Sequence, residues 1–238
     1  VEQEHEKATT IANVLGELAP VAVLPGERDV EVGGERLRDF LETYRLPIFS
    51  GLRGPTEQRF KADSALRMIG GHKLGFIGIA GSQALGQADA YTQGALALRR
   101  QGAEIVLAMV GLGGAEGEAL AGQINGVDII IIGGSEDVNP PKVVEGSLVV
   151  EAGDKGQRLG SLTFQMNGTG AFQYFDEGRD EKDALNKRIT RLQDALKNLE
   201  PGPGRTARAV KLAQLQEQLQ AIKPIPPKGR YVTWGIED

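Results

Sequence analysis

The stretch that decides the fold is Val127-Asp-Ile-Ile-Ile-Ile-Gly-Gly134, a nearly continuous apolar run that ends in two glycines. A strand with one face in water alternates apolar and polar residues, whereas an uninterrupted aliphatic run suits a strand that is covered on both faces. Glycines directly after such a strand favour a tight turn into the next element. The pattern therefore predicts a central strand of a layered sheet.

Helix and strand patterns alternate along the chain on the N-terminal side of this strand, which is typical of an α/β protein. A hairpin across Gly70-Gly71 is part of this series. On the C-terminal side, three strands at 147–151, 157–166 and 171–175 are expected to close the fold in antiparallel fashion. We expect the other helices at 4–18, 37–44, 90–100 and 116–124, and the other strands at 21–24, 47–50, 67–69, 73–79 and 104–110.

The last sixty residues have a different pattern. Two series of leucine and isoleucine residues, each spaced by three or four, flank Pro201-Gly-Pro-Gly204. This predicts an antiparallel helical hairpin over 179–223, between a domain at 1–178 and an extended C-terminal tail at 224–238. We interpret the hairpin as a structural appendage or linker. A partner-binding coiled coil is the alternative, and exposed apolar residues on its outer face would favour it.

Composition excludes several classes of function. The 238 residues include 27 Lys and Arg against 32 Asp and Glu, without a basic block, so nucleic acid is not an expected partner. Without cysteine, the chain has no disulfides, no Cys-ligated metal and no thiol catalysis. Every apolar run is far shorter than the roughly 20 residues of a membrane helix, so we expect no membrane insertion by this chain.

Further segments carry recognisable motifs. The turn after the first apolar run reads Gly26-Glu-Arg-Asp-Val-Glu-Val-Gly33, with both glycines where Gly-Asn-His-Glu-Phe-Asp-x-Gly has them. Leu46-Pro-Ile-Phe-Ser50 and Gly71-His-Lys-Leu-Gly-Phe-Ile-Gly-Ile79 follow, and Val149-Val-Glu-Ala-Gly comes after the double glycine. In this order, the segments resemble the 5′-nucleotidase and UDP-sugar hydrolase branch of the calcineurin-like metallophosphatases, over residues 4–178.

This resemblance implies a fold and a type of site. The fold is the metallophosphatase-like layered α/β/β/α sandwich, with the C-terminal helical hairpin added to it. The N-terminal strands of the family, which carry an Asp-x-His motif and a bridging Asp, would precede residue 4 and are apparently absent from this sequence. The implied site holds two metal ions about 3.5–4 Å apart, which clamp a phosphate and activate a water.

None of the five ligand or catalytic positions that can be carried over keeps its residue. The metal-ligating Asn of the family falls on Glu27, and the neighbouring His falls on Arg28. The His at the end of a later strand falls on Met109, and the two His of the last turn fall on Ser135 and Asp137. Borderline divalent metals favour imidazole nitrogen at such sites, and this sequence has no histidine at those positions. The resemblance therefore predicts vestigial site positions and no resident metal.

Acidic residues nevertheless remain around these turns. Glu27, Asp29, Glu136 and Asp137 are expected at the carboxyl ends of adjacent strands, where they could offer oxygen ligands to a hard cation. Arg28 adds a positive charge to the same group. We predict that Arg28 pairs with Asp137 or Glu27 and closes the vestigial pocket. Solvated charges on surface loops are the alternative.

The other candidate residues are weaker. His5 and His72 lie in polar surroundings, and we interpret both as surface residues. The loop Gly111-Leu-Gly-Gly-Ala-Glu-Gly117 has dinucleotide-loop spacing except that Glu116 stands where the last glycine belongs. A carboxylate there opposes a pyrophosphate, so we assign a plain turn and expect no cofactor.

The sequence thus leads to two hypotheses. The favoured one is a catalytically inactive metallophosphatase-like domain, a pseudoenzyme that serves as a structural or protein-docking module in a larger protein or assembly. Its expected partners are proteins or further domains of the same polypeptide. The alternative is a phosphoesterase with an altered, oxygen-rich metal site. The resemblance also implies a periplasmic or extracellular location, although no signal peptide is recognisable in this chain.

Overall fold

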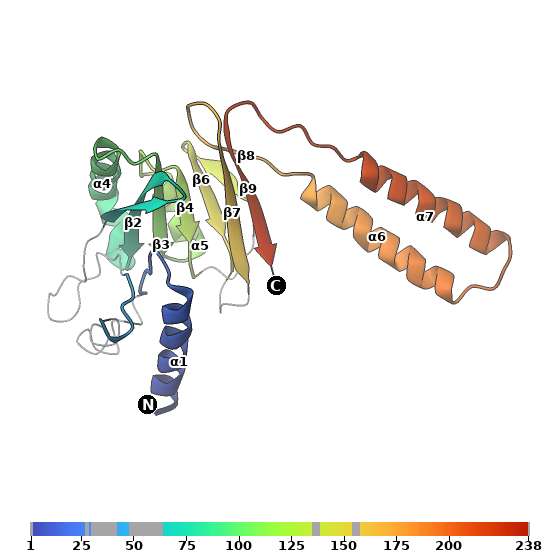
Figure 1. The fold of residues 1–238 in the computed structure, drawn as a ribbon, viewed down its shortest axis with the longest axis horizontal. Helices are drawn as coiled ribbons and strands as arrows, with labels where there is room; N and C mark the ends of the chain where they lie inside the picture. The colour runs from blue at the N-terminus through green and yellow to red at the C-terminus, as the bar shows by residue number, and fades with distance from the viewer. Residues whose placement is uncertain are drawn as a thin grey trace. The chain divides into compact units, whose positions relative to one another are not determined.

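The computed structural model of the chain describes residues 2–26, 29, 42–47, 64–134, 139–153 and 158–237. The chain divides into two compact units (Figure 1). The first comprises residues 1–161 and 235–238, and the second comprises residues 162–234.

A six-stranded sheet forms the centre of the first unit, in the order β1-β2-β3-β4-β6-β5. Strands β2, β3, β4 and β6 are parallel to their neighbours in this series. β1 pairs antiparallel with β2, as the predicted hairpin requires, and β5 pairs antiparallel with β6. The strands are β1 (Ser64–Ile69), β2 (His72–Ala80), β3 (Ile105–Gly111), β4 (Ile129–Ile132), β5 (Lys142–Val144) and β6 (Ser147–Glu151).

The isoleucine run forms β4 and lies inside this sheet, with β3 on one side and β6 on the other. Ile129 and Ile130, whose side chains alternate between the two faces, both have no exposed surface. Burial on both faces explains why the run contains no polar residue. The predicted central strand is therefore confirmed.

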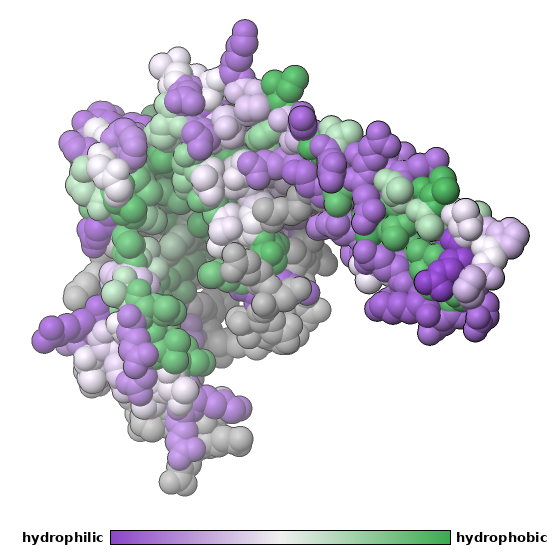
Figure 2. Space-filling model, turned by 45° about the vertical axis from the view of Figure 1, so that its right-hand side comes forward, coloured by the Kyte–Doolittle hydropathy of each residue, from purple (hydrophilic) through white to green (hydrophobic). Residues whose placement is uncertain are grey.

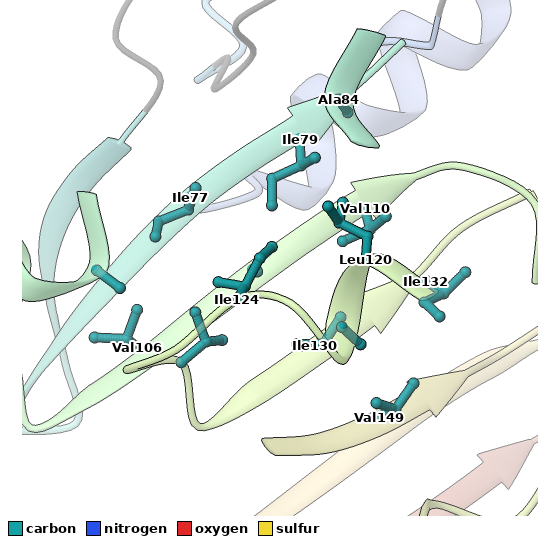
Figure 3. Packing of buried hydrophobic residues seen from close by; sticks show 14 of the residues in the cluster. Ile77, Ile79, Ala84, Val106, Val110, Leu120, Ile124, Ile130, Ile132 and Val149 are labelled. Atoms are coloured by element: carbon teal, nitrogen blue, oxygen red, sulfur yellow. The ribbon is translucent and has the colours of Figure 1, made fainter. Parts of the chain in front are cut away.

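Helices α4 (Ala88–Arg100) and α5 (Gly114–Ala121) cover one face of the sheet, together with the 3₁₀ helix η1 (Ser82–Gln87) (Figure 1). Val106, Ala108 and Val110 of β3 belong to the core beneath the helices, and Leu120 of α5 lies beside Val110 (Figure 3). The helices at 90–100 and 116–124 were thus predicted in the right places, with α5 ending three residues earlier than expected.

The N-terminal part of the chain differs in one respect from expectation. The predicted helix is present as α1 (Glu2–Leu18). The predicted strand at 21–24 is wrong, because within the described residues only Val23 forms a bridge, through its N–H to the carbonyl oxygen of Pro47 at 2.7 Å. Val21 is 40% exposed, so this run does not have the burial that its composition indicates. Most of the predicted helix at 37–44 and strand at 47–50 lies outside the described residues.

A second sheet has three strands in the order β7-β9-β8. They are β7 (Leu159–Met166), β8 (Gln173–Tyr174) and β9 (Arg230–Glu237). The predicted antiparallel close is wrong. β6 belongs to the first sheet and runs parallel to β4, and β8 runs parallel to β9. The C-terminal segment enters this sheet as its central strand, which separates β7 from β8.

The predicted helical hairpin is confirmed as α6 (Arg179–Lys197) and α7 (Pro203–Ala221). Its buried seam is formed by Leu185, Ile189 and Leu215, against which Leu192, Leu212, Leu219 and Ile222 pack. Val210 is 54% exposed and is the one large apolar side chain so exposed on these two helices within the described residues. Neither they nor the other described helices have the length and apolarity that crossing a membrane requires.

Candidate functional site

Strands β2, β3, β4 and β6 end at one edge of the first sheet, which we call the carboxyl edge. Because these strands are parallel, their last residues lie side by side: Ala80, Gly111, Ile132 and Glu151. Ligands of open parallel sheets bind beyond the carboxyl ends of the strands. The carboxyl edge is therefore the place to look for the predicted site residues.

The start of the Gly26–Gly33 turn lies at the carboxyl edge. A Cβ built on Gly111 would meet Leu24 Cδ2 at 3.5 Å, so the segment leading into the turn contacts the end of β3. Asp29 closes the turn locally: its Oδ2 accepts the N–H of Gly26 at 2.8 Å, and its own N–H donates to the carbonyl oxygen of Gly26 at 3.2 Å. One carboxylate oxygen of Asp29 is thus engaged in shaping the turn.

Met109 lies near the end of β3, at the position where the resemblance implies a metal-ligating histidine. Its strand neighbours in register are Gly78 of β2 and Ile131 of β4. The flanking Ala108 and Val110 point into the helix-covered core, so the half-buried Met109 side chain lies on the opposite face of the sheet. A thioether therefore stands where the implied site needs an imidazole nitrogen.

The remaining predicted positions lie outside the described residues. These are Glu27, Arg28, Ser135, Glu136 and Asp137. The pairing of Arg28 with Asp137 or Glu27 stays a prediction. The double glycine before residue 135 is described, and the N–H of Gly133 donates to the carbonyl oxygen of Val110 at 2.8 Å. This hydrogen bond holds the start of the last turn against the end of β3.

Sequence reasoning missed one acidic residue at the carboxyl edge. Glu151, the last residue of β6, is only 3% exposed and lies opposite Ile132 in register. Its Oε2 accepts a hydrogen bond from Asn139 Nδ2 at 3.2 Å. Its Oε1 is buried and has no hydrogen-bond partner among the described residues. The available signal was an acidic residue directly after the buried run Leu148–Val150.

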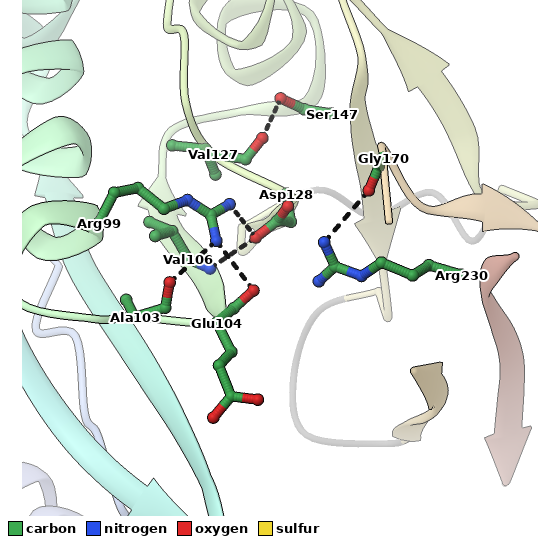
Figure 4. A network of polar contacts seen from close by, with 9 residues as sticks. All are labelled: Arg99, Ala103, Glu104, Val106, Val127, Asp128, Ser147, Gly170 and Arg230. Atoms are coloured by element: carbon green, nitrogen blue, oxygen red, sulfur yellow. Dashed lines mark hydrogen bonds and ion pairs between the residues drawn. The ribbon is translucent and has the colours of Figure 1, made fainter. Parts of the chain in front are cut away.

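A polar network occupies the opposite end of the sheet (Figure 4). The Asp128 carboxylate, just before β4, pairs with Arg99 and accepts the N–H of Val106 at 2.7 Å. Arg99 also donates to the carbonyl oxygens of Ala103 and Glu104, at 3.2 and 2.9 Å. These contacts join α4 to the amino ends of β3 and β4. They serve the fold and lie away from the carboxyl edge.

His72 belongs to the same end of the sheet. Its Nδ1 lies 2.8 Å from Glu104 Oε2, and its side chain is 46% exposed. The Glu104 carboxylate also accepts the N–H of Lys73 at 3.0 Å. The hydrogen bond from His72 is the main reason that the pKa of Glu104 is lowered. His72 is thus a surface residue, as predicted, whereas the side chain of His5 lies outside the described residues.

Gly117, the last glycine of the Gly111–Gly117 segment, has a packing role. A Cβ on Gly117 would lie 2.9–3.1 Å from three side-chain atoms of Ile132. Gly117 therefore lets α5 approach β4 closely. Glu116 lies in the first turn of α5, where its charge is favourable to the helix dipole and unfavourable to a bound phosphate.

The side chains present at the carboxyl edge show whether this site fits the metal ions that the resemblance implies. Met109 is the one described position among the five that were carried over, and its neutral thioether is a weaker ligand for most divalent metals than the imidazole that the resemblance implies. Among the described residues, no three His, Cys, Asp or Glu side chains form a cluster that could hold a metal ion.

Comparison with known proteins gives structural matches only. No protein-family model and no curated protein matches the sequence. A 5′-nucleotidase precursor from Thermus thermophilus is 22% identical with a TM-score of 0.58, over 68% of this chain and 38% of its own. The NAD nucleotidase NadN from Haemophilus influenzae is 16% identical with a TM-score of 0.58, over 68% and 40%. The sulfate thiohydrolase SoxB from Thermus thermophilus is 17% identical with a TM-score of 0.57, over 65% and 32%.

All three structures are of the 5′-nucleotidase branch of the metallophosphatases, and the likeness shows a shared fold. The predicted metallophosphatase-like α/β fold is therefore confirmed, with a mostly parallel sheet flanked by helices. The chain spans between about a third and two fifths of the length of these solved structures.

Proposed function

We propose that this chain is a catalytically inactive metallophosphatase-like domain that serves as a structural or protein-docking module in a larger protein or assembly. The observation that carries the proposal is Met109 at the end of β3. The fold resembles that of solved 5′-nucleotidase structures, and the resemblance of the sequence implies a metal-ligating histidine at the position that Met109 holds.

No neighbouring residue of β3 can supply the ligand that Met109 fails to supply. Met109 is held in register on both sides, by Gly78 and by Ile131. Its neighbours Ala108 and Val110 carry no donor atoms and point to the other face, and Gly111, the last residue, has no side chain. A one-residue slip would turn the buried face of the whole strand outward. The end of β3 therefore offers a sulfur and no nitrogen ligand.

The catalytic part of the proposal can be tested with the purified chain. Protein dialysed against Mg²⁺, Mn²⁺, Ca²⁺ or Zn²⁺ is analysed for bound metal and assayed with 5′-AMP and bis-p-nitrophenyl phosphate. We expect background rates with every metal. Turnover that is lost in Glu27→Ala or Asp137→Ala and kept in the control Glu200→Ala, an exposed residue after α6, would overturn the proposal.

The docking part concerns a protein partner or further domains of the same polypeptide, in a periplasmic or extracellular setting. Hydrogen exchange of the chain, alone and within the full-length polypeptide or its purified assembly, tests it. We expect slower exchange over a contiguous surface in the larger context. Identical exchange of every segment in both states would contradict a docking role.

The second candidate, a phosphoesterase with an oxygen-rich metal site, is favoured by Glu151. A carboxylate that is 97% buried, with an oxygen that no described residue satisfies, is costly unless a cation or donor meets it. Hard cations take carboxylate and amide oxygens, which Glu151 and Asn139 both carry. If Mg²⁺, Mn²⁺ or Ca²⁺ raises the melting temperature of the wild type and of Glu200→Gln, but not of Glu151→Gln, this candidate gains support. Equal or zero shifts in all three proteins would count against it.

A further inference from the structure

The α6–α7 hairpin carries an open groove of about 570 Å³ on its surface. The groove has an apolar floor and a polar rim. The floor is formed by Ala184, Leu185, Ala221 and Ile222, and the rim by Glu181, Arg188 and Gln218. On the face of the hairpin seen in Figure 2, hydrophobic side chains lie between hydrophilic ones.

The floor of this groove is incompletely covered. Leu185 is buried, but Ala184 and Ala221 are exposed and Ile222 is half-buried. Two antiparallel helices can bury only the seam between them, whereas four helices in a bundle bury a common core. The two alanines leave room for the side chains of another helix to reach the floor. The hairpin therefore has the form of half a bundle.

The charges on the rim decide which partner fits. Glu181 and Arg188 stand seven residues apart on α6, which places them two turns apart on one face of the helix. Among the described residues, neither makes an ion pair. In a two-fold interface, if one residue contacts a second across the axis, the second contacts the first in the same way. Antiparallel pairing of two α6 helices about a two-fold axis beside Ala184 and Leu185 brings each Glu181 to the other copy's Arg188.

We propose that a second copy of this chain docks on the groove through its own α6–α7 hairpin, so that the two hairpins form an antiparallel four-helix bundle. Each copy contributes the same floor of alanine, leucine and isoleucine and the same pair of rim charges. The two faces are thus alike in their apolar lining and complementary to each other in charge. This inference does not depend on whether the chain hydrolyses phosphoesters.

The test is the association state of the whole chain by sedimentation velocity, from about 1 to 100 µM. We expect a monomer–dimer equilibrium for the wild type. Glu181→Arg places two positive charges on each rim, and Arg188→Glu places two negative charges there. Each variant alone is expected to dimerise at least about tenfold more weakly, because like charges then meet across the axis. An equimolar mixture of the two variants should recover wild-type affinity as a heterodimer, because both contacts then join opposite charges.

Two matched controls carry the same charge changes at neighbouring exposed positions of α6, Asp183→Arg and Lys187→Glu. Neither residue lines the groove, so both variants should dimerise like the wild type. A third variant, Ala184→Glu, puts a charge on the floor and should abolish the dimer without loss of helix content by circular dichroism. A wild type that stays monomeric at about 100 µM would overturn the proposal. So would a dimer that persists in all three groove variants, or a mixture that fails to restore association.

Discussion

The Arg99 guanidinium in the last turn of α4 pairs with the Asp128 carboxylate just before β4, so that this ion pair joins α4 to the parallel part of the sheet. Asp128 is 8% exposed, and the same oxygen that meets Arg99 accepts the N–H of Val106. Its partners come from a helix and from the preceding strand. The ion pair therefore fixes where the amino ends of β3 and β4 lie beneath α4.

Asp128→Ala is expected to lower the free energy of unfolding by about 2–4 kcal/mol, because it leaves the Val106 N–H and part of the Arg99 charge without their acceptor. Asp128→Asn keeps an oxygen for Val106 and should cost less. Urea unfolding followed by circular dichroism measures both. Asp194→Ala, which removes an exposed ion pair with Lys197, is the control and should change stability by less than about 1 kcal/mol. Equal effects at positions 128 and 194 would contradict the role given to the buried pair.

Gly117→Ala is expected to destabilise the fold by about 1–3 kcal/mol, because the added methyl group would overlap the Ile132 side chain. Gly117 lies inside α5, whereas the control is Gly113→Ala, at the N-cap position just before the helix. Its φ is −61° and a Cβ there meets nothing within 4 Å, so its stability should stay near that of the wild type. Thermal unfolding of the two variants compares them directly. A loss in Gly113→Ala as large as that in Gly117→Ala would contradict the packing argument.

The contribution of Glu104 to stability should depend on pH. The pKa of its carboxyl group lies below its ordinary value of 4.5, because His72 and then the Lys73 N–H hydrogen-bond the charged form. A lowered pKa in the folded state means that the stabilisation is present above pH 4.5 and is lost as the pH falls through the lowered value. The difference in urea midpoint between wild type and Glu104→Gln should therefore shrink between about pH 5 and pH 3. A difference that is constant over this range would disprove the linkage, and Glu200→Gln serves as the control.

Leu215→Ala is expected to weaken the hairpin by about 2–4 kcal/mol, because Leu215 is 1% exposed in the seam against Leu185 and Ile189. Val210→Ala removes a smaller apolar side chain from the same helix at a 54% exposed position and should change stability by about 0.5 kcal/mol or less. Hydrogen exchange of α6 and α7 measures both changes locally. Equal protection in the two variants would show that the seam does not hold the hairpin together.

The parts of the fold that were predictable are those with a local pattern of burial. The isoleucine run of β4 predicts a strand covered on both faces, and the leucine spacing of α6 and α7 predicts two helices that share a seam. The hairpin of β1 and β2 follows from the glycine pair between two apolar runs. In each case the residues that specify the element lie within the element or next to it.

The candidate site was predictable to the same degree. Met109 could be placed near the end of β3 from the length of its strand, and the start of the glycine turn could be expected at the carboxyl edge. Glu151 was missed because its one sequence signal, an acidic residue directly after an apolar run, does not by itself distinguish a buried carboxylate from a solvated one. Its burial arises from Asn139 and from the strands packed around it.

The sequence by itself determined which segments are apolar, with what period, and therefore the type of most elements and the class of the fold. Only the tertiary structure decided that β9 lies between β7 and β8, that β6 runs parallel to β4, and that Val23 pairs with Pro47 outside a regular strand. The physical reason is that periodicity reports which face of an element is buried. Strand order, direction and register depend instead on partners that are distant in the chain, whose backbone hydrogen bonds look alike in any sequence.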